Sequence, residues 1–315
     1  MASTRERYIN FFTDFAFKRL FGSEPCKDLL LDFLNALLHK DTGRIESISY
    51  MKNEQVGRAE YDRRAIYDIY CNNEKGESFI VEIQKTKQKY FKDRALYYAT
   101  FPISAQAVKG DWDFKLVPVY VVAILDFIFD DDAGGDKYRY NVSLLDEETH
   151  KRFYDKLKFV YLELPKFKKE ESELQSHFEK WLYAIKNLSR LDRVPARLQE
   201  QVFEKFFEEA EIARFTPEEH LGYEDSLKAY RDLKNSIDTA RGEGLAQGLE
   251  QGREEGLAQG REEGLAQGLA RGKEESAFEI AQKMLQSGLP VEMILNCTNL
   301  TTAQIELLRR KAGQS

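Results

Sequence analysis

The segment DRRAIYDIYCNNEKGESFIVEIQK, residues 62–85, departs from the helical spacing that precedes it. Residues 66–71 and residues 78–84 alternate between two kinds of side chain, as strands do. The five residues Asn72-Asn73-Glu74-Lys75-Gly76 between these two stretches have the composition of a turn. The segment therefore predicts a β-hairpin with its turn centred near Lys75.

The predicted hairpin brings two acidic side chains together. With a turn at Lys75, residues whose numbers add up to 150 face each other, so Asp68 lies opposite Glu82. Opposed residues on antiparallel strands have Cβ atoms about 4.5–5.5 Å apart. Gln84 lies two residues beyond Glu82 and points to the same side of the strand. The hairpin thus predicts one patch made of Asp68, Glu82 and Gln84.

Two carboxylates at this spacing repel each other unless a cation lies between them or one of them binds a proton. Mg²⁺ takes oxygen ligands and commonly binds one or two carboxylates together with waters and a substrate phosphate. A bound Mg²⁺ polarises a phosphoryl group and lowers the pKa of an attacking water. The patch therefore indicates metal-dependent phosphodiester hydrolysis, with the backbone carbonyl of Ile83 as a further metal ligand. The competing interpretation is a solvated strand face whose acids have no function.

The flanking sequence predicts the other elements of one folded domain. Apolar residues recur at helical spacing, and near-continuous β-branched runs indicate buried strands. Helices are expected at 8–21, 26–39 and 90–108, the last with Pro102 inside it, and strands at 116–129 and 159–164. This order is typical of an α/β or α+β domain of about 165 residues.

The remainder of the chain shows helical patterns and a repeat. Glycine recurs at every fourth residue from Gly244 to Gly272, and the unit GLAQGREE occupies residues 256–263. Each glycine costs a helix about 1 kcal/mol relative to alanine, so the repeat is either a helix that self-associates or a flexible spacer. The expected divisions are a core at 1–167, a helical extension at 168–240, the repeat segment at 241–274 and a small helical tail at 275–315.

Composition limits the possible functions less sharply. The net charge of −7 counts mildly against a nucleic-acid ligand, but five basic residues follow the acid pair directly: Lys85, Lys87, Lys89, Lys92 and Arg94. The start of the chain is polar, and its longest apolar run is too short to cross a membrane. We therefore expect a cytoplasmic protein without a membrane partner.

Together these motifs resemble the PD-(D/E)XK nuclease superfamily, in particular its branch of Rpn family recombination-promoting nucleases, also described as PD-(D/E)XK nuclease family transposases. The stretches that carry the resemblance cover most of the chain: TDFAFKRLFG (13–22), the hairpin (62–85), YFKDRALYY (90–98), LVPVYVVAILDF (116–127), YLELPKF (161–167), KWLYAIKN (180–187) and the glycine repeat. The resemblance implies a restriction-endonuclease-like α/β core with a four-stranded mixed sheet, followed by an all-α C-terminal extension.

The resemblance also implies a Mg²⁺-dependent DNA endonuclease, with Mn²⁺ as an alternative ion. Asp68 and Glu82 match the metal-binding acids of the motif, whereas Gln84 stands where the wider superfamily has lysine. Glutamine orients water or bonds a phosphate oxygen, but it carries no charge. This departure puts the rate of cleavage in question.

Three further residues are possible accessories to the site. Asp14 matches the helix motif and is either a further acid of the site or a helix-surface residue. Lys18 lies one turn later, where it either contacts phosphate or is an ordinary exposed lysine. Arg94 either clamps a phosphate or forms a structural ion pair. Lys85 is predicted to point to the opposite side of the strand from Gln84, outside the site.

Two functional hypotheses follow. The first is a metal-dependent DNA endonuclease that acts in recombination, mobile-element or defence processes and forms homo-oligomers through its glycine repeat and C-terminal helices. The second is a catalytically weak DNA-binding or assembly protein that retains the nuclease fold. The tail, which resembles a helix-turn-helix, fits either a DNA contact or a small bundle for dimer contacts.

Overall fold

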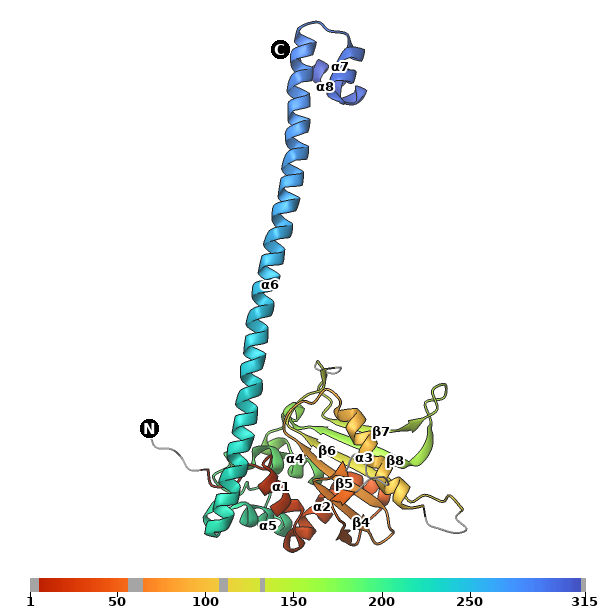
Figure 1. Cartoon of the computed structure of the whole chain (residues 1–315), viewed down its shortest axis with the longest axis vertical. Coiled ribbons are helices and arrows are strands. Elements are labelled where there is room, and N and C mark those ends of the chain that lie inside the picture. The colour runs from red at the N-terminus through yellow and green to blue at the C-terminus, as the bar shows by residue number, and fades with distance from the viewer. Residues whose placement is uncertain (1–5, 56–64, 108–112, 131–133, 313–315) are drawn as a thin grey trace. The chain divides into compact units, whose positions relative to one another are not determined.

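A computed structural model describes residues 6–55, 65–107, 113–130 and 134–312 of the chain (Figure 1). It divides into two compact units, Met1–Asn235 and Ser236–Ser315. The first unit is built on a mixed sheet with strand order β1-β4-β5-β6-β8-β7. Its strands are β1 (Ile48–Tyr50), β4 (Ile69–Asn73), β5 (Ser78–Gln84), β6 (Val119–Leu125), β7 (Arg139–Leu145) and β8 (Arg152–Glu163).

The sheet confirms the expected α/β core but has six strands among the described residues, not four. Strand β6 is parallel to both of its neighbours, β5 and β8, and every one of its residues is buried. The two strands that the sequence did not reveal, β1 and β7, lie at the two edges. Edge strands are half-exposed, so β7 lacks the continuous apolar run that identifies a central strand.

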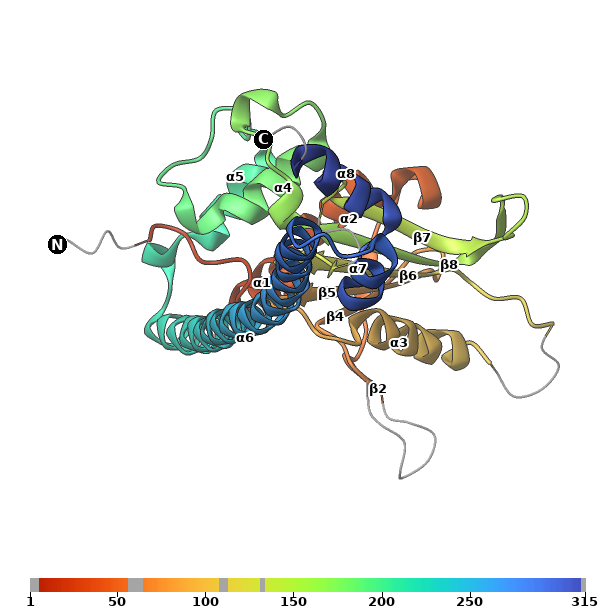
Figure 2. The same cartoon turned by 90° about the horizontal axis from the view of Figure 1, so that it is seen from above.

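Helices cover both faces of the sheet (Figure 2). One face carries α3 (Phe91–Ala105), whose buried side chains pack with Ile80 of β5 and Val121 of β6. The other face belongs to a larger core, which includes Phe79 of β5 and Trp181. Helices of that core are α1 (Asp14–Phe21), α2 (Lys27–Thr42), α4 (His177–Asn187) and α5 (Gln201–Ala210).

Helix α1 begins later than the sequence predicted, at Asp14 and not at residue 8. The Oγ1 atom of Thr13 accepts a hydrogen bond from the backbone N–H of Ala16 at 3.2 Å, which caps the helix. Before it, the Asn10 side chain accepts a hydrogen bond from the backbone N–H of Phe12 and forms a turn. The apolar residues at 8–12 are buried for another reason, because this segment pairs with the end of α5 through Tyr8 and Glu211.

The hairpin strand also begins later than predicted. Residues 65–66 form β3 (Ala65–Ile66), which pairs with β2 (Glu54–Gln55) in a separate two-stranded sheet. The main strand, β4, starts only at Ile69. Asp68 therefore lies in the short break between the two strands, immediately before the ladder with β5 begins. The predicted turn is present, and Gly76 adopts a positive φ of 78° there.

Helix α6 (Pro217–Gln286) contains the whole glycine repeat. It continues without interruption through residues 240 and 274, where the sequence suggested boundaries. A Cβ atom added to any of the eight repeat glycines would meet no other atom within 4 Å. No packing within the described chain therefore offsets the cost of these glycines to the helix.

The end of the chain is a small helical cluster of its own. The last turns of α6 pack with α7 (Val291–Thr298) and α8 (Thr302–Ala312) around Ala281, Ile294 and Ile305. The predicted turns are present, with Gly288 and Asn299 both in the left-handed region. Among the described residues, no helix combines the length and the apolar character needed to cross a membrane.

Candidate active site

The candidate site lies where β4 and β5 meet. The two strands are antiparallel, and Ile69 pairs with Val81 and Tyr70 with Ile80. The residue numbers of each pair add up to 150, as the sequence predicted. Continued by one residue, this register sets Asp68 opposite Glu82.

Backbone hydrogen bonds fix both carboxylates. The backbone N–H of Ile83 donates to Oδ2 of Asp68 at 2.8 Å, and the backbone N–H of Asp68 donates to Oε1 of Glu82 at 3.2 Å. Each acid is therefore held by the backbone beside the other acid. These contacts use one oxygen of each carboxylate, and the second oxygen of each lies outside them.

Burial raises the pKa of both acids. Glu82 is 6% exposed, and burial, followed by the charge of Asp68, raises the pKa of Glu82 to about 8. Burial also raises the pKa of Asp68, against the hydrogen bond from Ile83, which lowers it. A cation bound between these two acids would stabilise them, because a positive charge favours the ionised form of both.

Gln84 is also buried, and its amide is hydrogen-bonded at both ends. Its Oε1 accepts a hydrogen bond from Nη2 of Arg94 at 2.7 Å, and its Nε2 donates to the backbone carbonyl of Thr86 at 2.8 Å. Glu82 and Gln84 share the side of β5 on which Ile80 packs against α3, and this explains why a residue of α3 reaches them. Arg94 also donates to Oε1 of Gln88 at 2.6 Å. Both of these hydrogen bonds join the guanidinium to the side-chain amide of a glutamine.

Asp14 and Lys18 of α1, the two predicted accessory residues, lie within electrostatic range of Asp68. Lys18 and Asp14 form an ion pair of 2.9 Å on the exposed surface of α1. Both influence the pKa of Asp68, which Asp14 raises and Lys18 lowers. Within the described ranges, no three or more His, Cys, Asp or Glu side chains form a group suited to a metal ion, so Asp14 does not complete such a group with the acid pair.

The sequence predicts that Lys85 points away from Gln84 and lies outside the site, and this stays a prediction. Burial lowers the pKa of Lys85, and the charges of Asp14 and Asp68 raise it, so both acids lie within electrostatic range. Strand β5 ends at Gln84, so its ladder does not fix the direction of the Lys85 side chain. Alternation says nothing about a residue beyond the end of the strand.

Two tyrosines that the sequence gave no reason to select also lie near Glu82. The hydroxyl of Tyr67 donates to the backbone carbonyl of Tyr98 at 3.3 Å, and their rings meet edge to face at 5.4 Å. Burial raises the pKa of both hydroxyls, and the charge of Glu82 raises it further. Their position depends on the packing of α3, which residue spacing along the chain does not reveal.

The donor set fits a hard divalent cation. Two carboxylates from one hairpin match the one or two that Mg²⁺ commonly takes from a protein, with water and phosphate completing its coordination. Burial, the main cause of the raised pKa values, disfavours the negative charge of the pair, and a bound cation would offset this effect. When bound, such a cation lowers the pKa of an attacking water and offsets charge on a phosphoryl group.

The fold and the acid hairpin agree with a comparison against protein-family models. Residues 11–240 match the model for the PD-(D/E)XK nuclease family transposases, and the chain belongs to this family. The family suggests a nuclease- or transposase-like function with DNA as a substrate, and PD-(D/E)XK nucleases typically use divalent metals. Neither the curated proteins nor the solved structures gave a match.

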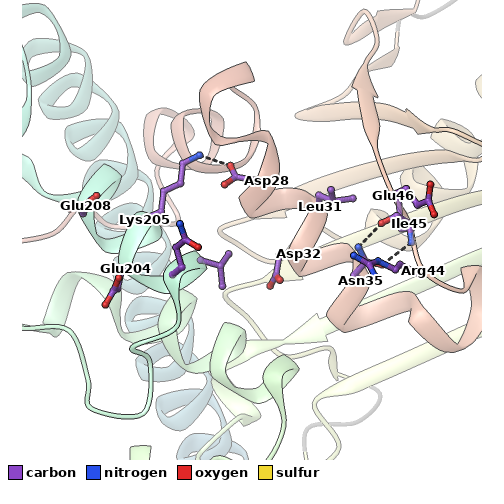
Figure 3. Close-up of a pocket in the computed structure, with 12 residues that line it drawn as sticks. Asp28, Leu31, Asp32, Asn35, Arg44, Ile45, Glu46, Glu204, Lys205 and Glu208 are labelled. Carbon is purple, nitrogen blue, oxygen red and sulfur yellow. Dashed lines mark hydrogen bonds and ion pairs between the residues drawn. The ribbon is translucent and has the colours of Figure 1, made fainter.

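A large surface pocket lies apart from these residues. It encloses about 940 Å³ between α2 and α5, and none of the residues expected to carry chemistry lines it (Figure 3). Two of its acids have structural partners: Asp28 pairs with Lys205 at 2.6 Å, and Asp32 accepts a hydrogen bond from Trp181. The size of this pocket therefore does not identify it as the site.

Proposed function

We propose that this protein is a Mg²⁺-dependent DNA endonuclease, with Mn²⁺ as an alternative ion. The observation that supports it most strongly is the buried pair of Asp68 and Glu82, held on one hairpin by reciprocal backbone hydrogen bonds. Without a bound cation, burial and mutual repulsion both disfavour the charged form of such a pair. The presence of both acids at one buried site is explained if they hold a cation.

In this proposal the residues have distinct tasks. Asp68, Glu82 and the backbone carbonyl of Ile83 hold the metal, and Gln84 contributes to the orientation of water or phosphate. Lys18 and Asp14, as an exposed ion pair beside Asp68, adjust the local charge and come within reach of the DNA backbone. We place the protein in the cytoplasm with its DNA, in recombination, mobile-element or defence processes.

The test is cleavage of supercoiled plasmid with Mg²⁺ or Mn²⁺. The wild-type protein is expected to nick the plasmid, and Asp68→Ala and Glu82→Ala to lose this activity while they remain folded. Asp28→Ala, which removes an ion-paired acid of α2, is the matched control and is expected to cleave normally. Equal cleavage by Asp68→Ala and wild type would show that the acid pair is not the site.

One observation favours a second function. Gln84 replaces the motif lysine and its amide already has protein partners, which favours a weakly catalytic DNA-binding or assembly protein that keeps the fold. Isothermal titration with Mg²⁺ and Mn²⁺ separates the two functions. Binding that disappears in Asp68→Ala supports the nuclease, and the lack of any binding to the wild type supports the alternative.

We also propose that the protein forms homo-oligomers through α6 and the C-terminal helices. The repeat contains eight glycines, each of which costs an exposed helix about 1 kcal/mol relative to alanine. Leu249, Leu257 and Leu265 of the same segment are more than half exposed. Close contact with a second copy of the helix would bury these leucines and offset the cost of the glycines.

A further inference from the structure

Arg94 is positioned by several contacts at the candidate site. Its Nη2 donates to Gln84 at 2.7 Å and its Nη1 to Gln88 at 2.6 Å. The guanidinium also lies over the rings of Phe91 and Tyr98, with its central carbon 5.0 Å and 5.7 Å from their centroids. These contacts come from Gln84 of β5, from Gln88 and from two rings of α3 itself, and together they orient the guanidinium.

Gln84 carries the main contact between Arg94 and the strand. Because its Nε2 bonds the carbonyl of Thr86, its Oε1 faces Arg94 and accepts the guanidinium hydrogen bond. A lysine at position 84 would place a second positive charge against Arg94 and remove the acceptor. The neutral Gln84 and Arg94 are therefore a hydrogen-bonded pair. The positive charge of this pair lies on α3 and not on β5.

The guanidinium lies within electrostatic range of both acids, since its charge lowers the pKa of Asp68 and of Glu82. Arginine stays protonated at any physiological pH and offers five N–H donors in a plane that matches phosphate oxygens. Its bonds to the two glutamines use one N–H each. The group is thus a fixed cation beside the carboxylates, suited to a phosphate oxygen.

We propose that Arg94 is the catalytic cation of this site and binds the scissile phosphate, while Gln84 is a positioning residue that holds it. This inference rests on the proposed nuclease function. In hydrolysis a water oxygen forms a new P–O bond and loses a proton to solvent, while the P–O ester bond breaks and the leaving oxygen takes up a proton. Arg94 stabilises the negative charge that develops on the non-bridging oxygens during this exchange.

Single variants of Arg94 test the charge. Arg94→Ala is expected to lower kcat for plasmid cleavage by about a hundredfold or more, as the loss of one stabilising donor does elsewhere. Its half-saturating Mg²⁺ concentration should not rise, since removal of a positive charge does not weaken cation binding. Arg94→Lys should keep part of the activity. Arg214→Ala, which changes net charge equally at an exposed ion pair with Glu211, is the control and should cleave normally.

Relocation of the charge separates a catalytic role from a structural one. Adding Gln84→Lys to Arg94→Ala returns a cation to the motif position. The double variant should cleave at least about tenfold faster than Arg94→Ala alone. Thermal unfolding followed by circular dichroism checks that each variant is folded. The proposal is overturned if Arg94→Ala cleaves like wild type, or if neither Arg94→Lys nor the double variant regains activity. If the wild type cleaves no DNA with either ion, the nuclease function itself fails, which is a different result.

Discussion

Glu82→Gln should stabilise the metal-free protein, and the gain should grow with pH. In the unfolded chain Glu82 ionises near its ordinary pKa of 4.5, whereas burial and Asp68 raise its pKa in the folded protein to about 8. Between these values the folded protein retains a proton that the unfolded chain has released. The free energy of unfolding therefore falls as pH rises through this window. Glutamine does not ionise, and its carbonyl still accepts the hydrogen bond from Asp68.

The size of the effect follows from the two pKa values. Each unit of difference corresponds to about 1.4 kcal/mol, so the interval from 4.5 to about 8 gives an upper limit of about 5 kcal/mol. We expect a gain close to zero below pH 4.5 and a few kcal/mol above pH 8. The charge of Asp68 supplies part of the shift, which keeps the gain below the limit.

Urea unfolding in EDTA, at about pH 5 and about pH 8.5, measures this difference. Glu179→Gln is the contrasting control, because hydrogen bonds from Lys169 and the backbone lower the pKa of Glu179 overall, against the effect of burial. That variant should lose stability at neutral pH, and the loss should shrink as pH falls through the folded pKa. A Glu82→Gln gain that is the same at both pH values would refute a raised pKa for Glu82.

Three further predictions concern other parts of the chain. Asp32→Ala should cost about 1–3 kcal/mol in urea unfolding, because the buried indole N–H of Trp181 loses its acceptor. The hydrogen bond to Asp32 also raises the pKa of His177, so this pair should stabilise the wild type below pH 6.5 and lose its effect as pH rises through the folded pKa of His177. Gly76→Ala should cost about 1 kcal/mol in thermal unfolding, because φ is 78° there; an unchanged Tm would contradict this. Gly260→Ala should leave the core intact and weaken self-association in light scattering if glycine contacts mediate it, whereas tighter association would rule out that contact.

The hairpin was predictable because its determinants are local. A turn of five residues and the alternation on both sides fix the register, and Ile69 pairs with Val81 as the numbering requires. The start of the strand was not predictable in the same way. Residues 65–66 pair with β2, and nothing in the alternation distinguishes a strand that changes partner from one that continues.

The surroundings of the acids depended on tertiary structure. Helix α3 was expected at nearly its observed place, but its rotation about its own axis decides that Arg94 meets Gln84 and that Tyr98 lies near Glu82. Helical spacing indicates which face of a helix is apolar, but it does not fix the rotation of the helix closely enough to predict individual contacts. The burial of Glu82 likewise follows from strands and a helix that lie far along the chain.

The core of the first unit joins residues that lie far apart in the sequence, so the order of synthesis decides when this unit can fold. The hairpin that carries Asp68 and Glu82 is complete once residue 84 has been made, but its central neighbour β6 and that strand's partner β8 come later, up to Glu163. The segment before α1 waits longer still, because the backbone N–H of Ile9 bonds the carbonyl of Ala210. Pairings between such distant residues form slowly and only when both partners are present. A ribosome-bound chain therefore carries the two acids long before the sheet around them can form, and we expect the proposed site to be complete only when the first unit is nearly complete.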